Sequence, residues 1–110
     1  MNKENSIIIA TYPDKETAKK AAKLLVESRF AASVQMFPVE SIYRWKGKIY
    51  EENEIVLSIR TKTAKFDEVS AFIKKNHSYE VPEIIEFPIT DGLPEYLNWI
   101  GECVESEIGD

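Results

Sequence analysis

Cysteine and histidine are the scarcest reactive residues of this chain, which has one of each, Cys103 and His77, among 110 residues. A single thiol excludes an internal disulfide and leaves too few sulfur ligands for a structural zinc site. We expect Cys103 to be a core residue near the C-terminus, in a protein that stays in the reducing cytoplasm. His77 would have to supply all of the imidazole chemistry.

Long hydrophobic runs and an excess of basic charge are also missing. The apolar stretch 7–10 is too short for a signal sequence or a membrane span, and no lipidation pattern follows it. Fourteen basic residues against 19 acidic ones give a net charge of −5, which repels nucleic-acid phosphates at long range. We therefore expect neither a membrane nor nucleic acid among the partners.

Catalytic motifs are absent as well. The chain has no Ser or Cys nucleophile motif, no Gly-rich phosphate loop and no HExxH. An enzyme of the acylphosphatase type would need a phosphate-cradling loop, and an RNA-binding sheet would need an aromatic and basic pattern that this chain lacks. We predict that the protein is not an enzyme.

What is present indicates one ordinary globular domain. Hydrophobic residues make up 44% and charged residues 30% of the chain, and no linker or repeat divides it, so one domain should span residues 1–110. The polar ends, 1–5 and 105–110, are expected to be frayed.

The most informative feature is a long β-hairpin between residues 30 and 60. Lys46-Gly47 can form a two-residue turn, with Gly47 at positive φ. Apolar and polar side chains alternate over residues 54–60, which is typical of a strand with one covered face. Pro38 cannot donate a ladder hydrogen bond, so the first arm should be an edge strand or carry a bulge.

The first arm of this hairpin is too long for its domain. Residues 30–45 would reach about 50 Å if extended, whereas a compact chain of this size has a diameter of roughly 35 Å. The overhanging arm should need a second surface to cover its apolar side chains, and this predicts oligomerisation. The expected interface residues are Ile42, Tyr43, Trp45, Ile49 and Tyr50.

Hydrophobic periodicity predicts the remaining elements. A buried strand should span residues 6–11, and a helix capped by Asp14 should follow it. A second helix should begin with Thr63 as its N-cap, a fourth strand should span 81–87, and a last helix should open with Pro94 in its first turn. Four apolar positions of the first helix share one face: Ala18, Ala21, Ala22 and Leu25.

The resulting order, βαββαβ with a C-terminal helix, favours an α+β ferredoxin-like sandwich. The first and third strands should lie in the middle of its antiparallel sheet, the second strand at an edge, and the helices on one face.

Three groups of residues are candidate sites, and each has a structural alternative. His77 with Glu83 could bind a metal, or His77 could simply end the second helix, where the helix dipole favours it. Tyr43, Trp45 and Lys48 at the hairpin tip could form an aromatic platform beside a cation, or they could anchor a subunit contact.

The third candidate group is the row of alternate residues from Glu54 to Arg60 on the returning arm. Glu54 and Arg60 could line a polar cleft between subunits, or they could belong to a solvated, salt-bridged strand face.

Several segments together resemble the CutA divalent-cation-tolerance family. They are IATYP at 9–13, FAASV at 30–34, SIYRWKGK at 41–48, HSYEVPEI at 77–84 and YLNWI at 96–100. Residues 54–62 match as well, so the resemblance covers nearly the whole chain. It is the order and spacing of these motifs that make it specific.

The resemblance implies a ferredoxin-like homotrimer whose long hairpins build intersubunit sheets, with an architecture like that of PII signalling proteins. It also implies a cytoplasmic protein linked to copper and other divalent metals.

Four positions depart from the pattern of that family. Ala10 stands where copper-binding members have cysteine, and Asn76 stands where they have a second histidine. Ser33 and Ser78 replace a frequent cysteine and proline. The missing sulfur argues against tight Cu(I) binding and leaves weaker Cu(II) or Zn(II) binding by His77 and carboxylates.

We therefore predict a non-enzymatic homotrimer that binds a divalent metal or a small anionic ligand in clefts between subunits, with no obligatory cofactor. The alternative is a trimeric scaffold or PII-like signalling protein whose metal binding is incidental. His77 and Glu83 are the predicted metal ligands. The predicted cleft residues are Tyr43, Trp45, Lys48, Glu54, Arg60 and Tyr79.

Overall fold

A four-stranded antiparallel sheet, ordered β2-β3-β1-β4, is the centre of the structure. The computed structural model describes residues 4–104. Its elements are β1 (Asn5–Tyr12), α1 (Lys15–Glu27), β2 (Ser33–Trp45), β3 (Lys48–Lys62), a 3₁₀ turn (Thr63–Lys65), α2 (Phe66–Lys75), β4 (Ile84–Pro88) and α3 (Pro94–Val104). The mixed α+β class, the central positions of β1 and β3 and the edge position of β2 are confirmed.

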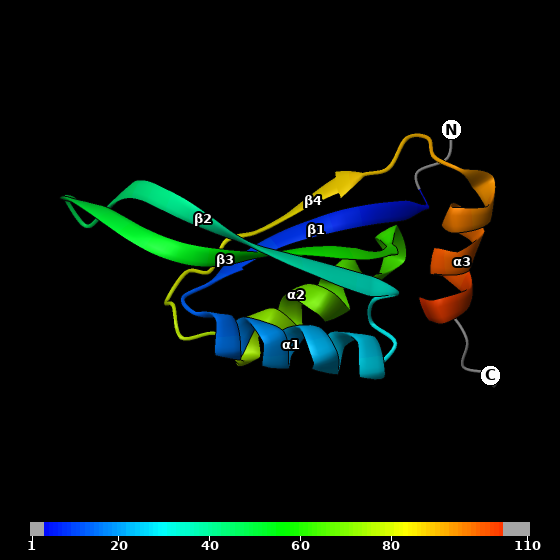
Figure 1. Ribbon diagram of the computed structural model, residues 1–110, viewed down its shortest axis with the longest axis horizontal. Coiled ribbons are helices and arrows are strands. Elements are labelled where there is room, and N and C mark those ends of the chain that lie inside the picture. The colour runs from blue at the N-terminus through cyan, green and yellow to red at the C-terminus, as the bar shows by residue number, and fades with distance from the viewer. Residues whose placement is uncertain (1–3, 105–110) are drawn as a thin grey trace.

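Helices α1 and α2 cover one face of the sheet, and α3 stands at the end opposite the hairpin tip (Figure 1). Ile8, Ala10 and Tyr12 point from β1 into the core, where they pack with Leu57 and Ile59 of β3. The helices add the predicted apolar stripe of α1 and, from α2, Val69 and Ile73.

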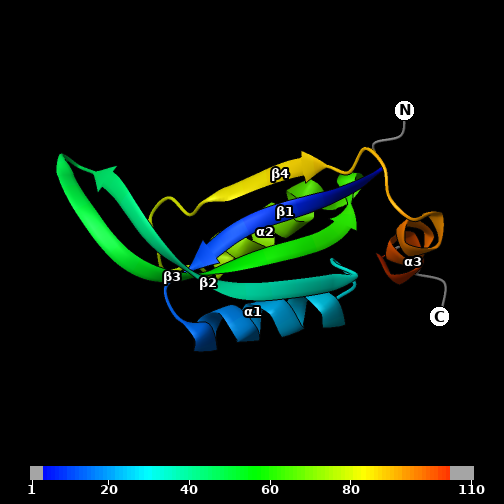
Figure 2. The ribbon, with the colours of Figure 1, turned by 45° about the horizontal axis from the view of Figure 1, so that its top comes forward.

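The β2–β3 hairpin overhangs this layer. Its register runs without interruption from Ser33↔Arg60 to Trp45↔Lys48, past Pro38 on the free edge. Lys46 and Gly47 form the predicted two-residue turn with φ of 52° and 83°, as a hairpin with the native strand twist requires. The molecule measures 46 × 27 × 21 Å, and its free hairpin end bends away from α1 (Figure 2).

Within residues 4–104, no helix covers the opposite face of the sheet over β2 or β4 (Figure 2). Ile7 and Ile9 of β1 pair with Phe87 and Ile85 of β4, and paired residues of neighbouring strands point to the same face. Ile85 is 45% and Phe87 52% exposed, and Phe37 on β2 is 45% exposed. Apolar side chains therefore stay exposed on both edge strands of this sheet.

Three predicted details of the elements are wrong. Thr63 is not a helix N-cap, because β3 continues to Lys62 and the Thr63 hydroxyl lies 2.6 Å from Ser6 Oγ on β1. β4 begins at Ile84, not at residue 81, because Val81 is exposed in a loop and Pro82 has no N–H for a ladder.

The third error concerns the chain ends. Asn5, expected in a frayed leader, pairs with Lys62 in the sheet. Residues 1–3 and 105–110 lie outside the described residues. Cys103 is partly buried in a small cluster with Ala32 and Ile100.

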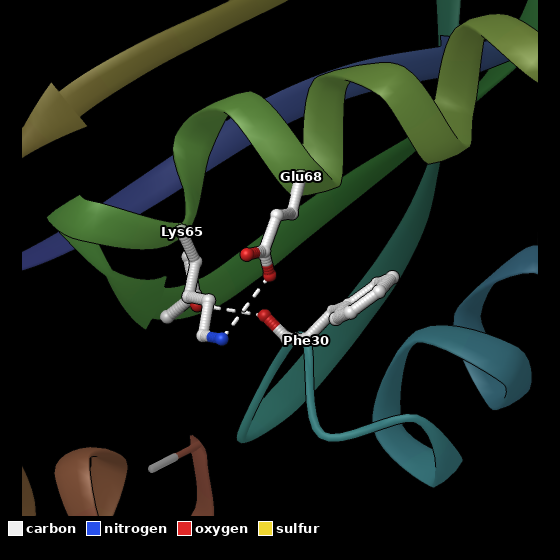
Figure 3. Close-up of polar contacts among 4 residues, drawn as sticks. Phe30, Lys65 and Glu68 are labelled. Carbon is white, nitrogen blue, oxygen red and sulfur yellow. Dashed lines mark hydrogen bonds and ion pairs between the residues drawn. The ribbon is translucent and has the colours of Figure 1, made fainter.

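The connection from α1 to β2 is tied to β3 by a backbone hydrogen bond and by a partly buried side-chain hydrogen bond. Thr61 Oγ1 donates to the Phe30 carbonyl oxygen at 2.7 Å, and the Phe30 ring meets Phe72 edge to face at 6.2 Å. Nearby, Lys65 Nζ lies 3.1 Å from Glu68 Oε1 (Figure 3). That ion pair is partly exposed and adds little, so the Thr61 bond and the ring contact hold this corner.

Asp14→Ala is expected to lower the free energy of unfolding by about 1 kcal/mol. Asp14 Oδ1 accepts the Thr17 backbone N–H at 2.9 Å and caps α1, as predicted. Chemical denaturation of the parent and the variant measures the difference. Lys20→Ala, at an exposed position of the same helix, is the control and should change stability by less than about 0.5 kcal/mol. Equal losses in both variants would contradict the cap.

Candidate functional site

A cleft of about 440 Å³ runs along the hairpin, from Glu54 at its root to Trp45 near its tip. One wall belongs to β2 and β3, which bring Ser41, Ile42, Tyr43, Trp45 and Glu54 together. Alternation along β2 places Ser41, Tyr43 and Trp45 on one side of the strand. The predicted grouping of Tyr43, Trp45 and Glu54 is therefore present in the structure.

The other wall of the cleft is the loop between α2 and β4. Tyr79, Glu80, Val81 and Glu83 line it, with Thr11 from the end of β1. Pro82 keeps this loop out of the sheet ladder, so the carboxylates before and after it face the cleft and not a strand partner.

Two tyrosine hydroxyls bind alternate carboxylates of β3. Tyr43 Oη donates to Glu52 Oε1 at 2.7 Å, and Tyr79 Oη donates to Glu54 Oε2 at 2.8 Å. The hydrogen bond to Glu52 raises the pKa of Tyr43 to about 12, and burial together with the Glu54 bond raises the pKa of Tyr79 well above its ordinary range. Both phenols therefore stay protonated below that range and keep donating these hydrogen bonds.

These two hydrogen bonds make stability sensitive to high pH. Both tyrosines have a raised pKa in the folded chain. Their contribution to the free energy of unfolding is therefore complete below the ordinary tyrosine pKa of 10.0, and it is lost as the pH rises toward 12. Thermal unfolding measured across this range should show the decline. The Tyr79→Phe variant should be less stable than the parent below pH 10, and its stability should fall less as the pH rises. A parent-like pH dependence in this variant would contradict the assignment.

His77 holds the corner of the cleft through both of its ring nitrogens. Nε2 lies 2.6 Å from the Thr11 carbonyl oxygen, and Nδ1 accepts the Tyr79 backbone N–H at 3.1 Å. The partners require the tautomer with hydrogen on Nε2. The ring also lies between those of Tyr12 and Tyr79, at centroid distances of 4.5 and 4.7 Å. His77 thus fixes β1 to the loop that carries Tyr79.

A metal site does not fit one chain. Both nitrogens of His77 are engaged with backbone groups, while Glu83 lines the cleft. Across residues 4–104, no group of three or more His, Cys, Asp and Glu side chains could hold a metal ion. Stable metal sites need three or four protein donors, so further ligands would have to come from a second copy.

The structure does not bring Lys48 and Arg60 into the cleft. Lys48 pairs with Trp45 across the turn, but it is Lys46 Nζ that lies over the Trp45 ring, at 5.5 Å. Arg60 pairs with Ile7 and Ser33 far along β3, and six residues of strand separate it from Glu54 by roughly 20 Å. Lys48 and Arg60, the two cations predicted to bind an anion, therefore lie outside the cleft lining.

Sequence reasoning missed three residues at this site. Lys46 Nζ reaches Glu80 Oε1 at 3.4 Å across the mouth of the cleft. Glu52 accepts the hydrogen bond from Tyr43. Its spacing of two residues from Glu54 puts both carboxylates on one face of the strand, and this sequence pattern could have identified it. Contacts across the loop, such as Lys46 to Glu80, have no local sequence signal.

The predicted interface residues form exposed apolar surface on the hairpin. Ile42 is 72% and Ile49 56% exposed, and Tyr43 and Trp45 are each 36% exposed. Tyr50 is partly buried and stacks on Tyr43 with the centroids 5.5 Å apart.

Comparison of the sequence with known proteins gives a consistent result. The family model of the CutA1 divalent ion tolerance protein matches residues 6–103. The divalent-cation tolerance protein CutA of Thermus thermophilus is 42% identical over 97 residues, which are 87% of this chain and 94% of that protein. The protein CutA homolog of Danio rerio is 41% identical over 101 residues, which are 91% of this chain and 67% of that protein. The chain spans 58% of the Mus musculus protein CutA.

Solved structures agree with the sequence comparison. The structure described as the periplasmic divalent cation tolerance protein CutA from Archaeoglobus fulgidus is 42% identical and superimposes with a TM-score of 0.90, covering 92% of this chain and 99% of that one. The Thermus thermophilus structure is 40% identical with a TM-score of 0.88, at the same coverage of both chains. The chain therefore belongs to the CutA1 divalent ion tolerance protein family.

Proposed function

We propose that this protein is a non-enzymatic, ferredoxin-like homotrimer that binds a small ligand in clefts at the hairpin roots, with the architecture of a PII-like signalling protein. The observation that carries this proposal is the overhanging hairpin with its exposed apolar side chains. Ile42 and Ile49 lie near the end of the hairpin, and within residues 4–104 no other segment buries them: they are 72% and 56% exposed. A second copy supplies the missing surface.

The open face of the sheet supports the same assembly. Phe37 on the β2 edge and Phe87 on the β4 edge are about half exposed. Both edge strands leave backbone groups available for pairing with another chain. The two edge strands differ, so β2 of one copy would contact the β4 side of the next copy. Such a head-to-tail contact can close into a ring, whereas a symmetric dimer needs the same surface on both subunits.

Divalent metals enter this proposal as secondary ligands. The names of the relatives refer to divalent-cation tolerance, but one chain offers neither three donors nor a free imidazole nitrogen. We propose that Cu(II) or Zn(II) binds only in the assembly, where carboxylates such as Glu83 bind the ion and a second copy supplies the remaining ligands. Such binding is weak and involves no soft sulfur ligand.

A scaffold function is the second candidate, and one patch favours it. Tyr96 and Trp99 on α3, with rings 5.6 Å apart, are 40% and 39% exposed. Leu93 beside them is 66% exposed. This patch lies at the end of the molecule away from the hairpin (Figure 1) and is available to another polypeptide.

Light scattering coupled to size exclusion tests the assembly. At micromolar concentration the expected mass is that of three chains of 12.6 kDa, about 38 kDa. Native mass spectrometry of protein purified without added metal should show the same trimer and any retained small molecule. A mass of one chain at every concentration would overturn the proposal.

Residence in the cytoplasm stays a prediction, and fractionation of cells that express the full-length protein tests it. None of the helices within residues 4–104 has the length and hydrophobicity needed to cross a membrane.

A further inference from the structure

The ionisable side chains of the cleft lining are all acidic or phenolic. They are Glu54, Glu80, Glu83, Tyr43 and Tyr79, and no lysine or arginine of residues 4–104 is among the lining residues. The nearest described ammonium at its mouth, Lys46 Nζ, is bound to Glu80. A concave wall of one charge sign favours ligands of the opposite sign, so this cleft selects cations and not the anions that the sequence suggested.

Glu54 is the central charge of this site. It is only 7% exposed, and its Oε2 accepts the hydrogen bond from Tyr79. Oε1 is not one of the buried side-chain oxygens without a partner among residues 4–104, so it is open to the cleft. A partly buried carboxylate attracts a cation more strongly than a fully exposed one, because less water screens its charge. The cleft gives an external cation access to this carboxylate.

Aromatic side chains surround this carboxylate. Tyr43, Trp45 and Tyr79 line the same cleft, and the faces of such rings attract ammonium and guanidinium groups. The protein already shows the interaction at the rim, where Lys46 Nζ lies 5.5 Å from the Trp45 ring centre and 3.4 Å from Glu80 Oε1. An alkylammonium group is thus seated between an indole and a carboxylate at the entrance.

The donor set distinguishes an organic cation from a metal ion. A metal ion needs several converging ligand atoms, and residues 4–104 contain no such group of three. An alkylammonium ion needs one carboxylate and apolar or aromatic walls for its carbon atoms. Only the second requirement is met here.

We propose that the cleft binds an organic cation, an alkylammonium or guanidinium group, with its charge at Glu54 and its carbon atoms against Tyr43, Trp45 and Tyr79. This deepens the proposed function and rests on it, because it names the ligand class of the same cleft. The cation belongs either to a free small molecule or to a basic side chain of a second copy.

Calorimetric titration with n-butylammonium tests the charge requirement on the parent protein. This probe reproduces the lysine side chain found against Trp45, and 1-butanol is its neutral analogue. Butylammonium should bind at least roughly tenfold more tightly than butanol, as a partly desolvated carboxylate and cation–π contact predict. Measurable binding of both probes with equal affinity would overturn the inference.

Glu54→Gln tests the assigned carboxylate. The amide keeps an acceptor for Tyr79 and removes the charge, so butylammonium binding should weaken roughly tenfold or more. Glu51→Gln, on the same strand but exposed and outside the cleft lining, is the matched control and should bind like the parent. Thermal unfolding of both variants shows whether they are folded, and the comparison of butylammonium with butanol needs no variant.

Light scattering on the same samples separates the two sources of the cation. If butylammonium does not bind and Glu54→Gln alone dissociates the trimer, a basic side chain of a second copy occupies the cleft, and the inference stands. If neither butylammonium binding nor assembly depends on Glu54 while the parent is trimeric, the organic-cation inference fails and the proposed assembly remains. A monomeric parent protein overturns the proposed function itself, whatever the titration shows.

Discussion

Trp45→Ala is expected to weaken trimer formation by about 2 to 4 kcal/mol, which is roughly a 30- to 1,000-fold loss in association. Trp45 is the last residue of β2, at the tip of the overhanging hairpin, and is 36% exposed in the single chain. Large aromatic residues with this placement are the side chains on which interfaces most often depend. Sedimentation velocity over a range of concentrations measures the shift from trimer to smaller species.

Leu24→Ala is the matched control for this effect. Leu24 is a large apolar residue with a similar exposure of 40%, but it lies on α1, away from the free end of the hairpin (Figure 1). Its truncation should leave the mass distribution unchanged. A Trp45→Ala protein as trimeric as the parent at every concentration would remove Trp45 from the interface and leave it only as a wall of the cleft.

His77→Ala is expected to lower the free energy of unfolding by about 2 to 3 kcal/mol. The variant loses the bonds to the Thr11 carbonyl and the Tyr79 N–H, and it loses the ring contacts with Tyr12 and Tyr79. Thr11 is only 6% exposed, so its carbonyl oxygen would be left buried without this partner. Denaturant unfolding at one fixed protein concentration measures the loss, because the proposed assembly would make stability depend on concentration.

The neighbouring substitution Ser78→Ala is the control, since Ser78 is exposed in the same loop and its truncation should cost less than about 0.5 kcal/mol. Titration of the His77→Ala protein with Zn(II) separates the two roles of the histidine. A variant with the stability of the parent that has lost Zn(II) binding would make His77 a metal ligand and contradict its role in holding the corner.

Local signals in the sequence predicted most of the fold. The Lys46-Gly47 turn, the Asp14 cap and the alternation along β3 each depend on residues close together in the chain. Turn chemistry, capping and periodicity act over this range, so a sequence displays them directly. The family was predictable for a related reason, because its motifs are short and keep their order and spacing.

The chemistry of the cleft was predictable only in part. Tyr43, Trp45, Glu54, Tyr79 and Glu83 were named from the sequence and do line one cleft. The sequence did not show which charges accompany them. Lys48 and Arg60 looked suitable by residue type, but the length and direction of β3 carry them elsewhere.

By itself, the sequence determined the α+β class, the overhanging hairpin and the family. Tertiary structure alone decided what His77 does, because its partner Thr11 lies 66 residues away, and which tyrosine meets Glu54, because Tyr79 lies 25 residues away. Such pairs form when separate strands and loops pack against each other, and no local pattern specifies the meeting of two distant side chains. The acidic, aromatic character of the cleft arises in that packing.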